Sequence, residues 1–394
     1  MVAPLGTGIA QADKQFVWLQ GRVADDWNGR KCATRRLVMT AMDDKLAAMR
    51  KVHLVVCDLF LPSDIVAGAC AGLRLPALEK MLARGASTGH ATSTGSGRTG
   101  GVGAFLEDYL CELFGVPCQG NAPIAPVSAA FDGLGEGCWL RADPVHLRLQ
   151  RDQLVLLPNV EASAGEAAQL CAALNEYFAG QGMEFFAPHP QRWYMRLDQL
   201  PEIGTVPLSQ AAGRNVRGLL PKGKEAMHWH RVFNEIQMLL FAHPVNEARE
   251  ARGELPVNSL WLWGSGVNIA PQKTYDGVSS DEVLAGMFAA AAGIPFSGWP
   301  EQWRDEENGG RQLLVWTGLR SALQRGDLEA WRAALQEFET GYAQPLWRAL
   351  RAGKISQLQV DILDGERVRH LLLKRADARA FWRRSEPLAQ YSMV

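Results

Sequence analysis

The sequence lacks any cysteine pair with metal-binding spacing. Its seven cysteines are scattered singly: Cys32, Cys57, Cys70, Cys111, Cys118, Cys138 and Cys171. An odd number of cysteines without a CxxC pair argues against a disulfide framework. Because free thiols persist in a reducing compartment, we expect a cytoplasmic protein without disulfide bonds.

Long apolar runs and an excess of charge of one sign are also missing. No apolar run approaches the roughly 18 residues that a membrane span needs, and the N-terminus has no apolar stretch typical of a secretory signal. The 41 basic and 42 acidic residues nearly cancel, which leaves a formal net charge of −1. Since nucleic acids and anionic membranes select basic surfaces, we expect neither as a partner.

Two common enzyme motifs are absent as well. No Gly-x-Ser-x-Gly elbow supports a serine hydrolase, and no G-x-G-x-x-G follows a strand and opens a helix, as a dinucleotide fold requires. Residues 86–103, ASTGHATSTGSGRTGGVG, are rich in Gly, Ser and Thr. They lack the Gly-Lys-Ser/Thr ending of a phosphate loop, so we expect a flexible surface loop.

What the sequence does contain is an alternation of strand and helix patterns. A hydrophobic content of 47% over 394 residues supports a large core or more than one. Buried strands are predicted at 52–60, 258–264 and 311–319, and helices at 75–85, 104–115, 280–294 and 327–353, the last as one long helix or a pair. Residues 355–373 predict two strands around the Asp364-Gly365 turn.

The middle of the chain has a different pattern. Residues 138–158 alternate apolar and polar positions as a hairpin does, and Ser163 and Glu166 have the spacing of a capping box at the start of a helix. A strand at 183–197 and a helix at 226–243 complete a compact α+β unit. We therefore expect a poorly ordered N-terminal extension at 1–48, core segments at 49–137 and 253–394, and an α+β insert domain at 138–252.

One stretch carries a family resemblance. Residues 243–266, HPVNEAREARGELPVNSLWLWGSG, resemble the segment HP-(V/I)-N…R…G…P-A-N-x-(I/L)-W-L-W-G-x-G of cofactor-independent, archaeal-type phosphoglycerate mutases. These enzymes belong to the alkaline phosphatase superfamily, and the chain is more similar still to a bacterial branch labelled phosphoglycerate mutase or Rpf-type regulatory protein.

The resemblance implies an α/β fold of the alkaline phosphatase type. Its three-layer core has a mainly parallel sheet and is interrupted by the α+β insert domain. It also implies that the strand containing Trp261 and Trp263 leaves the insert and re-enters the core sheet, where the two indoles serve mainly as scaffold.

The same resemblance, together with residue chemistry, suggests ligand-binding residues. The candidates are Asp58, His243, Asn246, Arg249, Asn258, Gly264 and Arg320. Asp58 follows the first strand, a side-chain amide can bond a phosphate oxygen, and a glycine lets the backbone approach a ligand closely. Arg320 can bind a carboxylate or a phosphate bidentately, so we expect it to pair with Asp58 or with an anionic ligand.

Catalysis in this superfamily requires two divalent metals and a Ser or Thr nucleophile. The chain departs from that set at several positions. Leu106 and Glu107 stand where the nucleophile is expected, and Arg320 and Gln324 stand where Asp and His metal ligands are expected. Asp361 on a late strand has no adjacent His. We therefore expect no catalytic residues and no metal site, with Asp58 as the one remnant.

Three functional hypotheses follow. The first is a degenerate, regulatory mutase homologue without cofactors, which binds a small phosphorylated ligand or a protein partner. The second is an active metal-dependent 2,3-bisphosphoglycerate-independent mutase, an isomerase, or a related phosphatase with a Mn or Zn pair. The third is an inert structural module.

Overall fold

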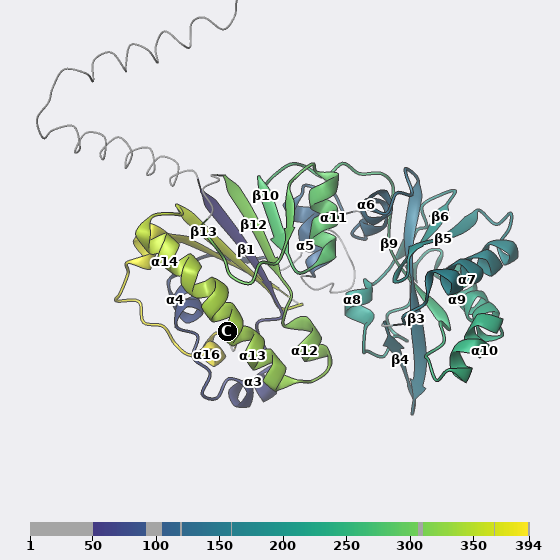
Figure 1. The fold of residues 1–394 in the computed structure, drawn as a ribbon, viewed down its shortest axis with the longest axis horizontal. Coiled ribbons are helices and arrows are strands. Elements are labelled where there is room, and N and C mark those ends of the chain that lie inside the picture. The colour runs from purple at the N-terminus through teal and green to yellow at the C-terminus, as the bar shows by residue number, and fades with distance from the viewer. Residues whose placement is uncertain are drawn as a thin grey trace, which may run out of the picture.

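The computed structural model describes residues 50–91, 105–118, 120–158, 160–305, 310–365 and 367–392. These residues form two large β-sheets that lie side by side, and a separate two-stranded sheet (Figure 1). We call residues 138–266 the second part and the remaining described residues the core part. The predicted N-terminal extension, together with most of the predicted loop at 86–103, lies outside the described residues.

The core part is built on a seven-stranded sheet. Its strands, in spatial order, are β11 (Phe296–Gly298), β10 (Gly277–Ser280), β12 (Arg311–Trp316), β1 (Lys51–Cys57), β13 (Gln357–Leu363), β14 (Val368–Lys374) and β2 (Ala86–Ala91). The first five are parallel to one another, and β14 and β2 are antiparallel additions at one edge. The mainly parallel sheet and the hairpin around Asp364-Gly365 are therefore confirmed.

The expected loop at 86–103 is wrong for its first six residues. Residues 86–91 form β2, which pairs with β14. The backbone N–H and C=O groups along an exposed edge of a sheet need partners, and this pairing satisfies them despite the low strand propensity of Gly and Ser.

Helices cover both faces of this sheet, which completes a three-layer core (Figure 1). One face packs against α3 (Ser63–Ala69), α4 (Pro76–Arg84), α12 (Arg320–Gln324), α13 (Leu328–Phe338), η1 (Glu339–Ala343), α14 (Gln344–Ala352), α15 (Arg375–Ala378) and α16 (Leu388–Ser392). The other packs against α5 (Leu106–Leu113), α6 (Ile124–Phe131) and α11 (Val283–Ala291). None of the described helices has the length and apolarity to cross a bilayer.

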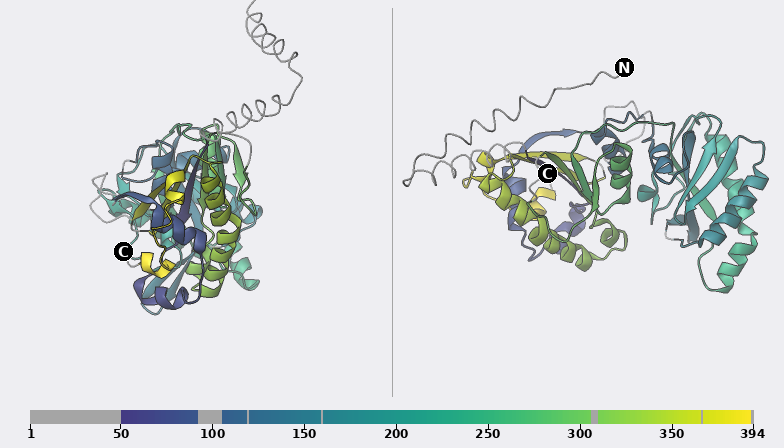
Figure 2. Two further views of the ribbon diagram at one scale, coloured as in Figure 1. Left: turned by 90° about the vertical axis from the view of Figure 1, so that its left-hand side faces the viewer. Right: turned by 45° about the horizontal axis from the view of Figure 1, so that its top comes forward.

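The second part has its own antiparallel sheet, seen in a turned view in Figure 2. It contains β3 (Cys138–Gln150), β4 (Gln153–Leu157), β5 (Met183–His189), β6 (Arg192–Leu197) and β9 (Ser259–Gly266), with a small pair β7 (Ile203–Gly204) and β8 (Lys222–Gly223). Its helices are α7 (Ala164–Tyr177), α8 (Leu208–Ala211), α9 (Ala226–Phe241) and α10 (Pro244–Ala251). The predicted capping box of Ser163 and Glu166 opens α7.

The strand that contains the two tryptophans corrects an expectation. β9 does not re-enter the seven-stranded sheet; it pairs antiparallel with β3 in the second part. The indole N–H of Trp263 donates to the buried carboxylate of Asp143 on β3 at 2.7 Å, and that of Trp261 donates to the Val206 carbonyl oxygen at 2.8 Å. These bonds hold β9 against the second part, and both indoles are scaffold. The predicted domain boundaries at 137/138 and 252/253 stay predictions.

The two sheets share a buried hydrophobic cluster, although no backbone pairing joins them among the described strands. The shared cluster includes Val55 and Val315 from the core part together with Val145, Phe233 and Trp261 from the second part. Removing such side chains from water stabilises the contact at about 25 cal/mol per Å² of apolar surface. The second part is thus independent in strand pairing and continuous with the core part in packing.

Candidate functional site

Asp58 occupies a special backbone position directly after β1. Its φ angle is 61°, in the left-handed region that residues other than glycine seldom adopt, and its N–H donates to the Leu363 carbonyl oxygen at 2.8 Å. The side chain keeps 30% of its surface exposed. In open α/β sheets, ligands bind beyond the carboxyl ends of the strands, which is where Asp58 lies.

Arg320, the first residue of α12, pairs with Asp58, one of the two partners considered for it; binding of an anionic ligand stays a prediction. Its Nε donates to Asp58 Oδ2 at 3.2 Å, and its Nη1 lies 3.9 Å from Glu282 Oε2. Burial alone would lower the pKa of Arg320, but its neighbour Cys57 and then the carboxylates Asp58, Glu107 and Glu282 raise it. Arg320 therefore remains a fixed cation among carboxylates.

Two further carboxylates come from the loop between β10 and α11. Asp281 accepts two bonds from the backbone N–H of Thr317, at 2.8 and 3.1 Å, which ties the ends of β10 and β12 together. Glu282 accepts from the Leu284 N–H at 3.2 Å and so caps α11. Burial raises the pKa of both carboxyls.

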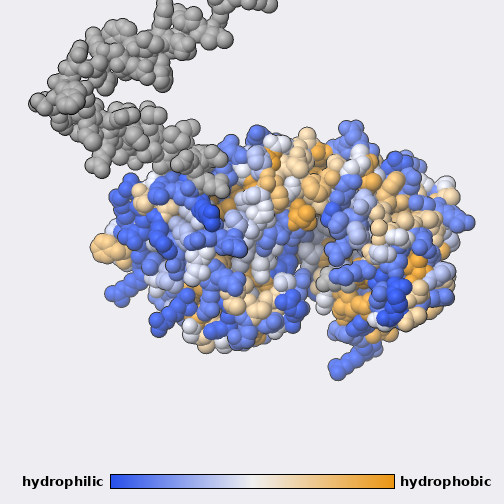
Figure 3. All heavy atoms as spheres, in the orientation of Figure 1, coloured by the Kyte–Doolittle hydropathy of each residue, from blue (hydrophilic) through white to orange (hydrophobic). Residues whose placement is uncertain are grey.

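Glu107, the second residue of α5, is the most buried carboxylate of this group. Its Oε1 accepts a hydrogen bond from the Ser209 hydroxyl at 2.6 Å, while its Oε2 is buried and has no hydrogen-bond partner among the residues that the structure describes. Ser209 belongs to α8, on the side of the second part that faces the core part (Figure 1). The group therefore lies at the junction of the two parts, where Figure 3 shows the surface indented.

We call this group the acidic junction: Asp58, Glu107, Asp281, Glu282 and Arg320. Sequence reasoning found Asp58 and Arg320 but missed the other three. Glu107 was considered only as a residue in place of a nucleophile. Asp281 and Glu282 were assigned to a helix, because the four-residue strand β10 before them was not predicted. The available signal was a short strand that ends in Ser279-Ser280 and is followed directly by two acidic residues.

The acidic junction does not fit the two-metal centre that the resemblance implies. A guanidinium pairs with Asp58, and chain donors occupy both oxygens of Asp281 and one oxygen each of Glu107 and Glu282. No histidine is among the recorded contacts of Arg320. No group of three or more His, Cys, Asp or Glu side chains arranged for a metal ion occurs in the described part of the chain.

A second polar network lies deeper on the same face of the sheet, around Asp361. This fully buried carboxylate accepts bonds from His53, Tyr109, Gln359 at 2.7 Å and His370 at 3.0 Å. Burial alone would raise the pKa of Asp361, but the bonds from His370, His53 and Tyr109 lower it.

The Asp361 network corrects the expectation that Asp361 has no histidine beside it. His370 lies directly opposite Asp361 in the β13–β14 hairpin, and His53 comes from the neighbouring β1. Because donors already occupy the carboxylate, the network explains how a charge is held in the core.

The HPVN segment holds α10 in place. His243 caps α10 by accepting from the Val245 N–H at 3.2 Å. The buried amide of Asn246 donates to the carbonyl oxygens of Leu240 and Val257, at 2.7 and 2.8 Å, and accepts from the Val257 N–H at 2.9 Å. These intramolecular bonds account for both side chains, and a role of either in ligand binding stays a prediction.

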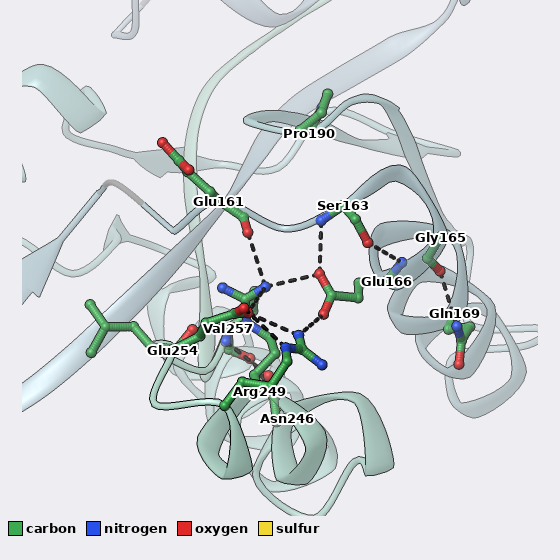
Figure 4. Close-up of polar contacts among 12 residues, drawn as sticks. Glu161, Ser163, Gly165, Glu166, Gln169, Pro190, Asn246, Arg249, Glu254 and Val257 are labelled. Carbon is green, nitrogen blue, oxygen red and sulfur yellow. Dashed lines mark hydrogen bonds and ion pairs between the residues drawn. The ribbon is translucent and has the colours of Figure 1, made fainter.

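Arg249, also on α10, lies beside Glu166 at the start of α7 (Figure 4). Its guanidinium donates to the carbonyl oxygens of Leu255 and Glu161, at 2.9 and 3.0 Å, and to Glu166 Oε2 at 2.9 Å. With 2% of its surface exposed, Arg249 joins α10, α7 and the segment that leads to β9. As a ligand-binding residue it stays a prediction.

The last two candidates, Asn258 and Gly264, lie just before and within β9, and both contribute to its packing. The Asn258 amide exchanges two bonds with the backbone of Leu147, at 2.7 and 2.9 Å, and so extends the β3–β9 pairing. Gly264 has a φ of 69°, and a Cβ there would lie 3.2 Å from Ile124 Cβ in α6. The structure thus brings Asp58 and Arg320 together and places the other five candidates in the second part, where their ligand roles remain untested.

The chain is similar in sequence to named mutases. It is 28% identical over 207 residues to a 2,3-bisphosphoglycerate-independent phosphoglycerate mutase of Methanosarcina acetivorans, covering 49% of this chain and 48% of the relative. It is 38% identical over 61 residues to a probable enzyme of this name from Geobacter sulfurreducens, covering 16% and 15%. The matches thus span about half or less of these relatives. No protein-family model matches the chain.

A structural neighbour carries a related name. The chain superimposes on a cofactor-independent phosphoglycerate mutase from Thermoplasma acidophilum with a TM-score of 0.45 and 14% sequence identity. The superposition covers 86% of this chain and 94% of that one.

Proposed function

For this phosphoglycerate mutase-like chain, we propose a function without phosphoryl transfer: it binds a small ligand, or a protein partner, at the acidic junction and acts as a regulatory protein. The observation that carries the proposal is the ion pair of Arg320 with Asp58. A guanidinium that is fixed 3.2 Å from this carboxylate opposes a divalent cation at the same place, because like charges repel strongly at such distances.

The missing nucleophile supports the proposal independently. In-line phosphoryl transfer needs an oxygen nucleophile, together with positive charge on the transferred group. α5 begins with Leu106 and Glu107, and neither side chain carries a hydroxyl group. The carboxylate of Glu107 is bonded on one oxygen to Ser209.

An active, metal-dependent 2,3-bisphosphoglycerate-independent mutase, or a related phosphatase with Mn or Zn, is the second candidate. The names of the relatives favour it. In that case Asp58 would hold a metal ion and Arg320 would have to leave its present pairing.

A turnover assay separates the two candidates. We expect purified full-length protein with added Mn²⁺ to convert 3-phosphoglycerate to 2-phosphoglycerate no faster than buffer, beside a working mutase as positive control. The Asp58→Ala variant should give the same background rate. Turnover by the wild type that is lost in Asp58→Ala would reject the proposal and establish the metal-dependent enzyme.

A further inference from the structure

Glu107 has one carboxylate oxygen that no described residue satisfies. The residue is 5% exposed, and its Oε2 has no hydrogen-bond partner within the described part of the chain. Buried polar groups are almost always paired, and an ionised one without a partner is strongly destabilising. An exception of this kind requires an explanation, and a ligand that supplies the missing donor is one.

The charges around Glu107 indicate that such a ligand would be positively charged. Three further carboxylates, Asp58, Asp281 and Glu282, act electrostatically on the same guanidinium as Glu107 does. That guanidinium, Arg320, forms ion pairs with Asp58 and Glu282. Burial, followed by the charges of Glu107 and Asp281, raises the pKa of Glu282, whereas Arg320 lowers it. The acidic junction therefore carries excess negative charge that its own guanidinium does not balance.

We propose that the acidic junction binds an organic cation, a primary ammonium group that donates to Glu107 Oε2 from between the strand ends and α8. This inference rests on the proposed ligand-binding function and names its ligand class. An ammonium group has three donors and no acceptor, and one of its N–H groups is enough to satisfy Glu107 Oε2. Asp58 and Glu282 keep 30% and 27% of their side chains exposed, whereas Glu107 is 5% exposed.

A phosphorylated ligand fits this charge pattern less well. Four carboxylates would repel its phosphate group, and Arg320 is already engaged with Asp58. A divalent metal ion is also disfavoured, since it needs several oxygen ligands at once and most oxygens here already accept bonds from the chain.

The alternative is that Glu107 serves only to join the two parts through Ser209. That role needs one oxygen and no charge, because an amide oxygen accepts from a hydroxyl equally well. A Glu107→Gln variant keeps an acceptor for Ser209 and removes the buried charge. The substitution therefore separates a joining role from a cation-binding role.

The experiment is a calorimetric titration of the full chain with putrescine, a four-carbon diamine, at low ionic strength. We expect wild-type protein to bind it, and Glu107→Gln to weaken binding by at least about tenfold, as loss of a buried charge partner does. The control is Glu112→Gln, on the exposed side of the same helix, which should bind as the wild type does. Without ligand, Glu107→Gln should melt at an equal or higher temperature, since the unpaired charge is gone.

The other possible results distinguish a failure of this inference from a failure of the proposed function. No binding of putrescine to the wild type, or binding that Glu107→Gln leaves unchanged, overturns the inference. If 3-phosphoglycerate binds more tightly than putrescine without turnover, the inference fails while the ligand-binding function survives. Mutase turnover with Mn²⁺ would instead reject the proposed function itself. Should Glu107→Gln fold poorly, Ser209→Ala replaces it: this variant should keep putrescine binding, because Oε2 remains in place.

Discussion

Two aspartates near the central strand of the sheet show how surroundings decide what a residue can do. Asp58 is partly exposed and pairs with one guanidinium, so one of its oxygens can still meet a ligand. Asp361 is fully buried, and four side chains donate to it. A charge buried in this way is stable only while those donors stay in place, which makes Asp361 a structural residue.

The Asp361 network predicts a pH dependence of stability. The bond to Asp361 raises the pKa of His370 above its ordinary value of 6.5, and the charges of Asp361 and Glu112 add to this. A raised folded-state pKa gives stability that is complete below about pH 6.5 and is lost as the pH rises through the folded value. Each unit of elevation corresponds to about 1.4 kcal/mol.

Urea unfolding between pH 6 and pH 9 checks this effect. The free energy of unfolding of the wild type should fall across that range, and the His370→Gln variant should show a flatter profile. Equal slopes in the two proteins would show that the His370 pair does not contribute. On the acid side, Asp361 has a lowered pKa, so its stabilisation should be lost as the pH falls below about 4.

The role of a single residue could be predicted where its charge and its position relative to a strand were enough to suggest a partner. Asp58 follows a recognisable buried strand, and Arg320 stands where the resemblance places a metal ligand, so their pairing could be anticipated. Glu107 could not be assigned a role, because its importance arises from burial against α8, far away in sequence. The two histidines beside Asp361 required the register of β13 with β14 and β1.

At the scale of elements, hydrophobic periodicity and turn residues predicted where helices and hairpins form. They did not predict which distant strands pair with each other. The helices at α4, α7, α9 and α13 and the β13–β14 hairpin follow from hydrophobic spacing and turn residues. The pairing of β9 with β3 does not, because a buried strand of this composition fits either sheet. Asn258 and Trp263 decide it through bonds to β3, and such contacts are invisible in a single sequence.

Asn246 joins three elements, and removing its amide should destabilise the second part. Asn246→Ala leaves the backbone N–H and C=O of Val257 without their buried partner and removes the shorter of two hydrogen bonds to the Leu240 carbonyl oxygen. We expect the free energy of unfolding to fall by about 3 kcal/mol. The control is Asn234→Ala on the exposed face of α9, which should change stability by about 0.5 kcal/mol or less. If Asn246→Ala instead weakens ligand binding at unchanged stability, its predicted ligand role is correct.

For the whole molecule, the shared cluster raises the question of whether the two parts unfold together. Strand pairing separates them, whereas side chains from both sheets lie in one buried cluster. The bond from Ser209 to Glu107 adds a polar link at the same junction. Continuous apolar packing makes partial unfolding costly, because opening one part exposes the matching surface of the other.

We therefore expect one cooperative unfolding transition, which two core substitutions can test. Leu170→Ala lies in α7 of the second part and Leu335→Ala lies in α13 of the core part; both leucines are fully buried, in separate clusters. Each substitution should cost about 2–5 kcal/mol. Hydrogen exchange in urea, read on peptides from β1 and β3, should show either substitution lowering both unfolding midpoints equally. If Leu170→Ala lowers the midpoint for β3 and leaves that for β1 unchanged, the parts unfold independently and the shared cluster does not couple them.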